Sequence, residues 1–80
     1  MDLTRIGTLY AGFVIKPRPF HRQSGEWTLD LRIWRDGGDA IGAREFHGRD
    51  TFPTEAAAIR ACVRFGEEII DGRVPGLSMA

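Results

Sequence analysis

Apolar and polar side chains alternate most regularly between residues 26 and 35. The apolar side of this alternation comprises Trp27, Leu29, Leu31 and Ile33. The other side comprises Thr28, Asp30, Arg32 and Trp34. A period of two residues is typical of a β-strand with one buried face. The pattern therefore predicts a central strand over residues 26–35.

A second, less regular alternation precedes it and predicts another strand over residues 8–16. Its more apolar side comprises Leu9, Ala11, Phe13 and Ile15, and the opposite side comprises Tyr10, Gly12, Val14 and Lys16. Pro17 ends this strand because proline has no backbone N–H to donate to a sheet. Tyr10, Val14 and Lys16 are therefore expected on the face of the sheet that points away from the core.

The segment after the central strand predicts a turn and a third strand. Asp36 to Asp39 reads DGGD, which favours a turn because glycine tolerates positive φ and aspartate can bond to its own backbone. A strand over residues 40–47 is expected to follow. Ile41 and Ala43 share one parity there and Phe46 has the other, and a β-bulge between them would bring these side chains to one face.

Residues 54–71 carry the marks of an amphipathic helix. Thr54 suits the N-cap, and Glu55 lies in the first turn, where the helix dipole favours a carboxylate. Gly72 and Pro75 predict its end. The apolar stripe comprises Ala58, Ile59, Cys62, Phe65, Gly66, Ile69 and Ile70, and the charged side comprises Arg60, Arg64, Glu67, Glu68 and Asp71. A stripe of this kind indicates a helix that covers a core.

Together these elements predict an α+β domain in which a three-stranded antiparallel sheet packs on one C-terminal helix. The helix is the only predicted element long enough to cover the apolar face of the sheet. Gly66 costs about 1 kcal/mol relative to alanine inside a helix, and it would let the helix approach an aromatic side chain of the sheet, Trp27 or Phe13. We expect a single domain over residues 8–72, a flexible N-terminus over 1–7 and an unstructured tail over 73–80.

The composition restricts the environment and the partners of the chain. With 80 residues, the domain buries only roughly 60% of the surface that its unfolded chain exposes. The 11 Lys and Arg residues balance the 11 Asp and Glu residues, so no net basic charge points to nucleic acid. We expect no signal peptide, because the start MDLTRIG has no basic region followed by a continuous apolar run. We expect no membrane span, because the chain lacks about 20 consecutive apolar residues. The single cysteine excludes an intrachain disulfide, and a cytoplasmic location is expected.

The sequence offers no complete catalytic or metal-binding set. Cys62 lies on the apolar stripe of the helix, where a cysteine is usually an inert core residue. His47 and Asp50 have a spacing that a metal site can use, but only His21 could add a second imidazole. We therefore expect no enzymatic activity, no metal and no cofactor.

The stretch KPRPFHR over residues 16–22 has two interpretations. In the first interpretation it is a nucleic-acid-binding arm, in which the cations contact phosphates and Phe20 and His21 stack on bases. As a connector it needs no partner, since proline ends the strand and Ser24 and Gly25 turn the chain. We favour the connector because the net charge of the chain is zero.

The order of the motifs resembles two groups of proteins. YAGFVIKPRP, GEW and TFPTEAAAIRACVRFGEEIIDG, within residues 10–72, resemble short, uncharacterised bacterial hypothetical proteins, some of them associated with prophages. That resemblance implies an antiparallel β region followed by one helix, and no known activity. A looser similarity to the plant-type AP2 DNA-binding domain, whose sheet contacts DNA through arginines and tryptophans, rests on Tyr10-x-Gly12, Arg18-Pro19, Gly25-x-Trp27 and Thr51-Phe52-x-Thr54. This chain departs from the basic AP2 sheet at Glu26, Asp30 and Glu45, so the AP2 resemblance implies a fold rather than a function.

The face of the sheet that no helix covers is the candidate binding surface. The candidate binding residues are Tyr10, Lys16, Arg18, Arg32 and Trp34. An exposed tryptophan beside arginine and tyrosine is a composition favoured at protein interfaces. We predict a non-enzymatic protein-binding or assembly module that binds a protein partner or itself, with sheet-face DNA binding as the alternative. Packing of Trp34 against Val74 and Leu77 of the tail would remove this surface.

Overall fold

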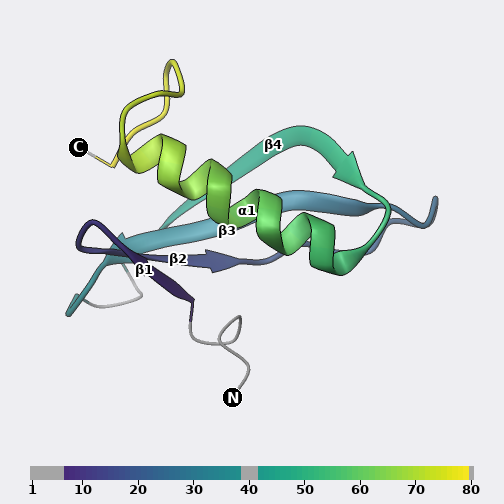
Figure 1. Ribbon diagram of the computed structural model, residues 1–80, viewed down its shortest axis with the longest axis horizontal. Coiled ribbons are helices and arrows are strands. Elements are labelled where there is room, and N and C mark those ends of the chain that lie inside the picture. The colour runs from purple at the N-terminus through teal and green to yellow at the C-terminus, as the bar shows by residue number, and fades with distance from the viewer. Residues whose placement is uncertain (1–6, 39–41, 80) are drawn as a thin grey trace.

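The computed structural model describes residues 7–38 and 42–79 as a sheet covered on one face by a helix (Figure 1). The elements are β1 (Thr8–Tyr10), β2 (Phe13–Pro17), β3 (Trp27–Arg35), β4 (Arg44–Phe52) and α1 (Glu55–Ile70). The strands lie in the order β1-β2-β3-β4, and each neighbouring pair is antiparallel. The expected α+β class, with an antiparallel sheet and one C-terminal helix, is confirmed. The expected number of strands is wrong, because the described sheet has four rather than three.

The additional strand arises because the stretch expected as one strand over residues 8–16 folds into a hairpin. Ala11 and Gly12 form its two-residue turn, with φ values of 49° and 85°. Positive φ at both positions is typical of a type I′ turn, whose twist matches that of the strands it joins. Tyr10 therefore pairs with Phe13. The alternation of a single strand does not continue through the turn.

β3 lies at the centre of the hydrophobic core, as its alternation predicts. The buried cluster comprises Ile15, Leu29, Leu31, Ile33, Phe46, Cys62 and Ile69. Three of these side chains come from β3, and the others come from β2, β4 and α1. Trp27, at the start of β3, is only half-buried and stacks on His21 with ring centroids 4.5 Å apart. The core therefore lies between α1 and one face of the sheet.

β4 lies later in the chain than the strand expected at residues 40–47. Residues 39–41, which include the end of the expected DGGD turn and the start of the expected strand, lie outside the described residues. β4 extends beyond the expected end because its last two residues still pair with the first two residues of β3. The strand thus leads almost directly into α1.

The irregularity of β4 is also placed differently from the expected bulge, which would precede Phe46. The register between β3 and β4 shifts between Thr28 and Asp30 instead. There Leu29 lies over Gly48, where a Cβ atom would be 2.1 Å from Cδ2 of Leu29. A glycine at this bend therefore lets a core side chain cover the backbone of β4.

α1 begins and ends where the sequence predicts. The backbone of Thr54 is extended, and its Oγ1 accepts a hydrogen bond from the N–H of Ala57 at 3.1 Å. At the other end Gly72 has a φ of 74°, and the N–H of Arg73 donates to the carbonyl of Glu68 at 2.9 Å, as in a Schellman motif. Within the described residues, no helix has both the length and the apolar character needed to cross a membrane.

Gly66 brings the backbone of α1 into close contact with the sheet. A Cβ atom on Gly66 would lie 2.7 Å from Cγ2 of Ile15, a side chain with no exposed surface. Any larger residue would therefore push the helix away from β2. The expected role of Gly66 fits this contact, but the expected aromatic neighbour, Trp27 or Phe13, is wrong because the neighbour is aliphatic.

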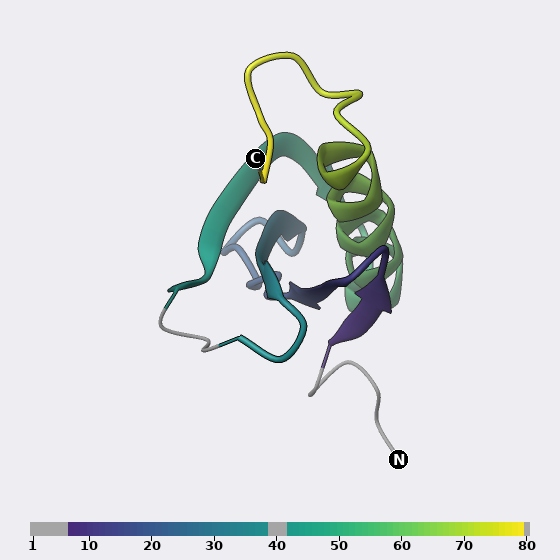
Figure 2. The same ribbon diagram turned by 90° about the vertical axis from the view of Figure 1, so that its left-hand side faces the viewer.

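The segment after α1 folds back onto the core. Val74, Leu77 and Met79 pack against the core cluster, and Nη1 of Arg44 donates to the carbonyl of Ser78 at 2.7 Å. The expectation of an unstructured tail is therefore wrong for this segment, which returns toward β4 (Figure 2). All but the last residue of the expected flexible N-terminus lies outside the described residues.

Gly66→Ala is expected to lower the free energy of unfolding by about 1–3 kcal/mol, because its methyl group would overpack the site against Ile15. An unconstrained helical glycine should respond in the opposite direction, since alanine is favoured by about 1 kcal/mol. Urea unfolding followed by circular dichroism measures the difference. Ile15→Ala removes the three carbon atoms nearest to the added methyl group, so the same substitution should cost less in that background. A gain in stability in the parent chain would contradict the close contact.

Candidate functional site

The face of the sheet opposite α1, here called the outer face, carries the candidate site. α1 and the core occupy the other face (Figures 1 and 2). Paired residues of neighbouring strands point to the same side of a sheet. The register therefore arranges the outward side chains in rows that run across the strands.

The first of these rows, here called the apolar row, consists of Leu9, Val14 and Trp34. Leu9 of β1 pairs with Val14 of β2, which pairs with Trp34 of β3. Leu9 is 63% exposed, and the other two are half-buried. Val74 and Leu77 of the tail pack against the core cluster on the covered face. The alternative in which Trp34 packs on these tail residues therefore does not fit the arrangement.

The second row, here called the charged row, consists of Lys16, Arg32 and Glu45. Lys16 of β2 pairs with Arg32 of β3, which pairs with Glu45 of β4. Nε of Arg32 donates to Oε1 of Glu45 at 2.8 Å. Lys16 forms no ion pair with any residue that the structure describes. The charge of this row thus changes from positive on β2 to negative on β4.

A third row joins Asp30 of β3 to His47 of β4, and Arg18 lies beside it. Asp30 pairs with His47 across the strands, and its Oδ1 bonds to Nδ1 of the imidazole. The N–H of Arg18 donates to the backbone carbonyl of Asp30 at 2.7 Å, which extends the pairing of β2 with β3. The Asp30 side chain is 16% exposed and that of His47 is 71% exposed. The imidazole therefore shields the carboxylate from solvent.

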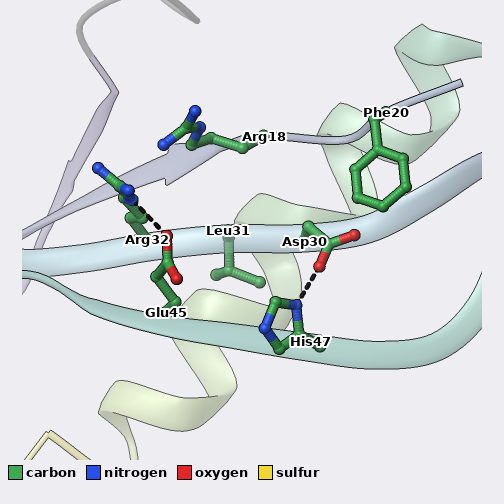
Figure 3. A pocket seen from close by; sticks show the side chains of 7 residues that line it. All are labelled: Arg18, Phe20, Asp30, Leu31, Arg32, Glu45 and His47. Atoms are coloured by element: carbon green, nitrogen blue, oxygen red, sulfur yellow. Dashed lines mark hydrogen bonds and ion pairs between the residues drawn. The ribbon is translucent and has the colours of Figure 1, made fainter.

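A groove of about 230 Å³ lies among these charged side chains (Figure 3). Its lining residues are Arg18, Phe20, Asp30, Leu31, Arg32, Glu45 and His47. Figure 3 shows the Arg32–Glu45 ion pair and the Asp30–His47 hydrogen bond next to each other across β3 and β4. Arg18 and Phe20 project from the segment that follows β2. Phe20 is 60% exposed. The groove therefore combines an aromatic surface with charges of both signs.

The cations of the groove stabilise the ionised form of Glu45. The hydrogen bond from Arg32 and the charge of that guanidinium lower the pKa of Glu45, and the charges of Arg18 and His47 lower it further. A carboxyl group with a lowered pKa stays negative throughout the neutral range. Exposed ion pairs contribute only about 0–1 kcal/mol to stability. These charges therefore define the character of the surface more than they hold the fold.

Four of the five candidate binding residues lie on the outer face or line its groove: Lys16, Arg18, Arg32 and Trp34. Two of them, Arg18 and Arg32, meet in the groove. Trp34 belongs to the apolar row, which lies beside the charged row on β2 and β3. The structure thus separates the candidate residues into an apolar part and a charged part.

Tyr10 does not belong to the outer face, and its expected position is wrong. Because the chain reverses at the Ala11–Gly12 turn, Tyr10 packs against the core cluster beside Phe13. Its hydroxyl donates to Oδ2 of Asp71 at 2.8 Å, just after α1. This hydrogen bond raises the pKa of Tyr10, because it stabilises the protonated hydroxyl.

Three further residues belong to the site although they are not among the binding residues predicted from the sequence: Leu9, Glu45 and His47. Leu9 has the same parity as the buried Ile15, and only the hairpin turns it to the outer face. Glu45 and His47 flank the buried Phe46. Strict alternation around Phe46 is the signal that would have identified this outward pair.

The KPRPFHR stretch continues the hairpin between β2 and β3. The N–H of Thr28 donates to the carbonyl of Phe20 at 3.1 Å, and that of Arg22 donates to the carbonyl of Glu26 at 2.8 Å. These hydrogen bonds give the stretch the geometry of a connector. It nevertheless supplies Arg18 and Phe20 to the groove.

Cys62 is fully buried between α1 and β3, as the helical stripe predicts. Its Sγ–H donates to the backbone carbonyl of Asp30 at 3.2 Å. Burial raises the pKa of the Cys62 thiol to about 11, so it stays protonated at neutral pH and is a poor nucleophile. The described residues hold no group of three or more His, Cys, Asp or Glu side chains that could bind a metal ion.

Native Cys62 is expected to react with an aromatic disulfide reagent roughly 100-fold or more slowly than in the urea-unfolded chain, because reaction requires local opening. The release of the reagent's thiol gives the rate. In a Cys62→Ala background, Ala56→Cys on the exposed side of α1 provides a control that should react rapidly in the folded state. Equal rates for native and unfolded Cys62 would mean that the stripe of α1 is misplaced.

Comparisons of the chain with protein-family models, curated proteins and solved structures found no match. The two resemblances in motif order therefore remain expectations.

Proposed function

We propose that the protein is a non-enzymatic protein-binding or assembly module and that the outer face is its binding surface. The observation that carries the proposal is the apolar row next to a groove that holds both arginines and carboxylates. Protein interfaces combine apolar anchors with polar surroundings in this way.

The apolar row supports a macromolecular partner. Leu9, Val14 and Trp34 form one continuous row across three strands, on the face that α1 leaves uncovered. Tryptophan and arginine are over-represented among the residues that contribute most to binding between proteins. Their position on a regular sheet gives them a fixed spacing, which lowers the entropic cost of binding.

The mixture of charges favours a protein over a polyanion. Arg32 is already paired with Glu45, and Asp30 lies in the same groove. Both carboxylates would repel phosphate groups, whereas a protein surface can offer complementary charges to both signs. DNA binding is the second candidate, because Lys16, Arg18 and Arg32 gather on this face.

A binding role also agrees with the chemistry of the remaining reactive groups. The Cys62 thiol is buried and protonated. His47 is bonded to Asp30 on the outer face, whereas Cys62 lies on the covered face beneath α1. Nucleophilic catalysis by a thiol needs a neighbouring base and access to substrate, and this thiol has neither among the described residues.

Trp34→Ala should weaken the binding of selected peptides roughly 30-fold or more while the protein stays folded, because a central tryptophan is a typical hot spot. Peptides can be selected from a random displayed library on the immobilised protein and then measured by fluorescence anisotropy. Arg60→Ala, on the exposed side of α1, is the control and should bind as the parent does. Unfolding of Trp34→Ala in a urea titration would place this side chain in the core and remove the basis of the proposal.

The DNA candidate makes a different prediction on the same face. If the outer face binds duplex DNA, Lys16→Ala and Arg32→Ala should each weaken the complex and lower the slope of log K against log salt by about one. Electrophoretic mobility shifts with random-sequence duplex over a range of salt concentrations measure this slope. If the salt slope falls in this way and Trp34→Ala does not change the affinity for the selected peptides, the partner of the outer face is DNA rather than a protein.

A further inference from the structure

From the charge pattern of the outer face, we infer that its partner is a second copy of this chain. The two outer faces would stack about a two-fold axis that lies between them and runs parallel to β3. This inference rests on the proposed function and names the partner that it leaves open.

The charged row is complementary to itself under this rotation. The row runs from Lys16 on β2 through Arg32 on β3 to Glu45 on β4. Rotation about an axis above β3 places β2 of one copy opposite β4 of the other. Lys16 of each copy therefore meets Glu45 of the partner subunit, so the same contact occurs twice. Arg32 lies near the axis, where its charge is already balanced by Glu45 of its own chain at 2.8 Å.

The same rotation leaves positions along the strand direction unchanged. Residues at one level along the strands therefore lie opposite residues at the same level in the second copy. Trp34, which lies on β3, is therefore near Trp34 of the partner subunit, whereas Leu9 and Val14 lie to one side of the axis. A two-fold interface must use one patch that is complementary to itself. The charged row and Trp34 meet this requirement together, because the axis passes above β3, which carries both Arg32 and Trp34.

The size and the shape of the molecule suit this contact. The principal extents are 36 × 33 × 19 Å, and the view along the shortest axis shows α1 lying over the sheet (Figure 1). The broad dimensions exceed what is needed for an interface of about 800 Å² per partner. Two sheets stacked face to face would form a sandwich with a helix on each outer side. A domain of 80 residues buries little surface by itself, so covering the second face would add stability.

The edges of the sheet are less suited to self-association. β1 has three residues, and β4 carries five charged side chains or imidazoles along nine residues: Arg44, Glu45, His47, Arg49 and Asp50. β4 also bends where Leu29 lies over Gly48. Short, charged and bent edge strands resist pairing with another chain. The face therefore offers the better contact.

Charge reversal tests the inference. Lys16→Glu and Glu45→Lys should each weaken dimerisation roughly tenfold or more, because each places like charges opposite each other twice. The double variant should restore it, since the carboxylate introduced at position 16 then meets the ammonium introduced at position 45. In each chain of the double variant Arg32 keeps a carboxylate neighbour in its row, at position 16. Sedimentation velocity between about 10 μM and about 1 mM gives the dissociation constants.

Mixing the two single variants gives an independent test. A heterodimer of Lys16→Glu with Glu45→Lys has opposite charges at both contacts, so the mixture should associate although each variant alone does not. Arg60→Glu on the exposed side of α1 is the control and should dimerise as the parent chain does. If Lys16→Glu unfolds by circular dichroism, Lys16→Ala replaces it and should still weaken dimerisation.

The outcomes separate this inference from the proposed function. A parent chain that stays monomeric at about 1 mM overturns the dimer, but peptide binding that depends on Trp34 would still support a protein-binding face. A dimer that tolerates both single reversals, or that the double variant fails to restore, uses another surface and overturns the inference as well. A dimer that is lost with Trp34→Ala and restored in the mixture of variants supports both.

Discussion

The contact between Gly66 of α1 and Ile15 of β2 is the constraint on which the rest of this structure depends. It brings the helix backbone onto the sheet, and one turn earlier it places Cys62 against the backbone of β3. The Asp30 carbonyl accepts hydrogen bonds from both the Cys62 thiol and the Arg18 N–H. The packing of α1 on the sheet therefore also fixes the backbone of β3 at Asp30, beneath the groove.

A single described helix can cover only one face of this sheet, so the two faces have different physical roles. The covered face carries the buried cluster and accounts for the stability of the domain through the burial of apolar surface. The outer face carries the Arg32–Glu45 ion pair, which contributes little to stability because both side chains are exposed to solvent. Its residues consequently contribute less to the stability of the domain than those of the covered face.

The pairing register converts a chain with no net charge into a surface with a definite pattern. Residues distant in sequence, such as Lys16 and Glu45, become the two ends of one row because each pairs with Arg32. The apolar row arises in the same way from three strands. Recognition by such a surface depends on the order of charges and apolar groups, which the overall charge does not reveal.

The sequence by itself determined the elements whose signals are local. The alternation of residues 26–35 identified β3 and its buried side, and Thr54 and Gly72 located the ends of α1, because side-chain periodicity and capping act within a few residues. The burial of Cys62 followed from the same helical stripe. Lys16, Arg32 and Trp34 could be assigned to the outer face because they lie in strands whose parity is continuous.

Only the tertiary structure decided the features that depend on contacts between distant residues. The Ala11–Gly12 hairpin turns Leu9 to the outer face and Tyr10 toward α1, and its positive φ values are sustained by the pairing of β1 with β2. The neighbour of Gly66 depends on how α1 meets β2, and the groove beside Arg18 depends on how the segment after β2 meets β3 and β4. Such contacts leave no periodic signal in the chain, because each is set by the packing of elements that are separated in sequence.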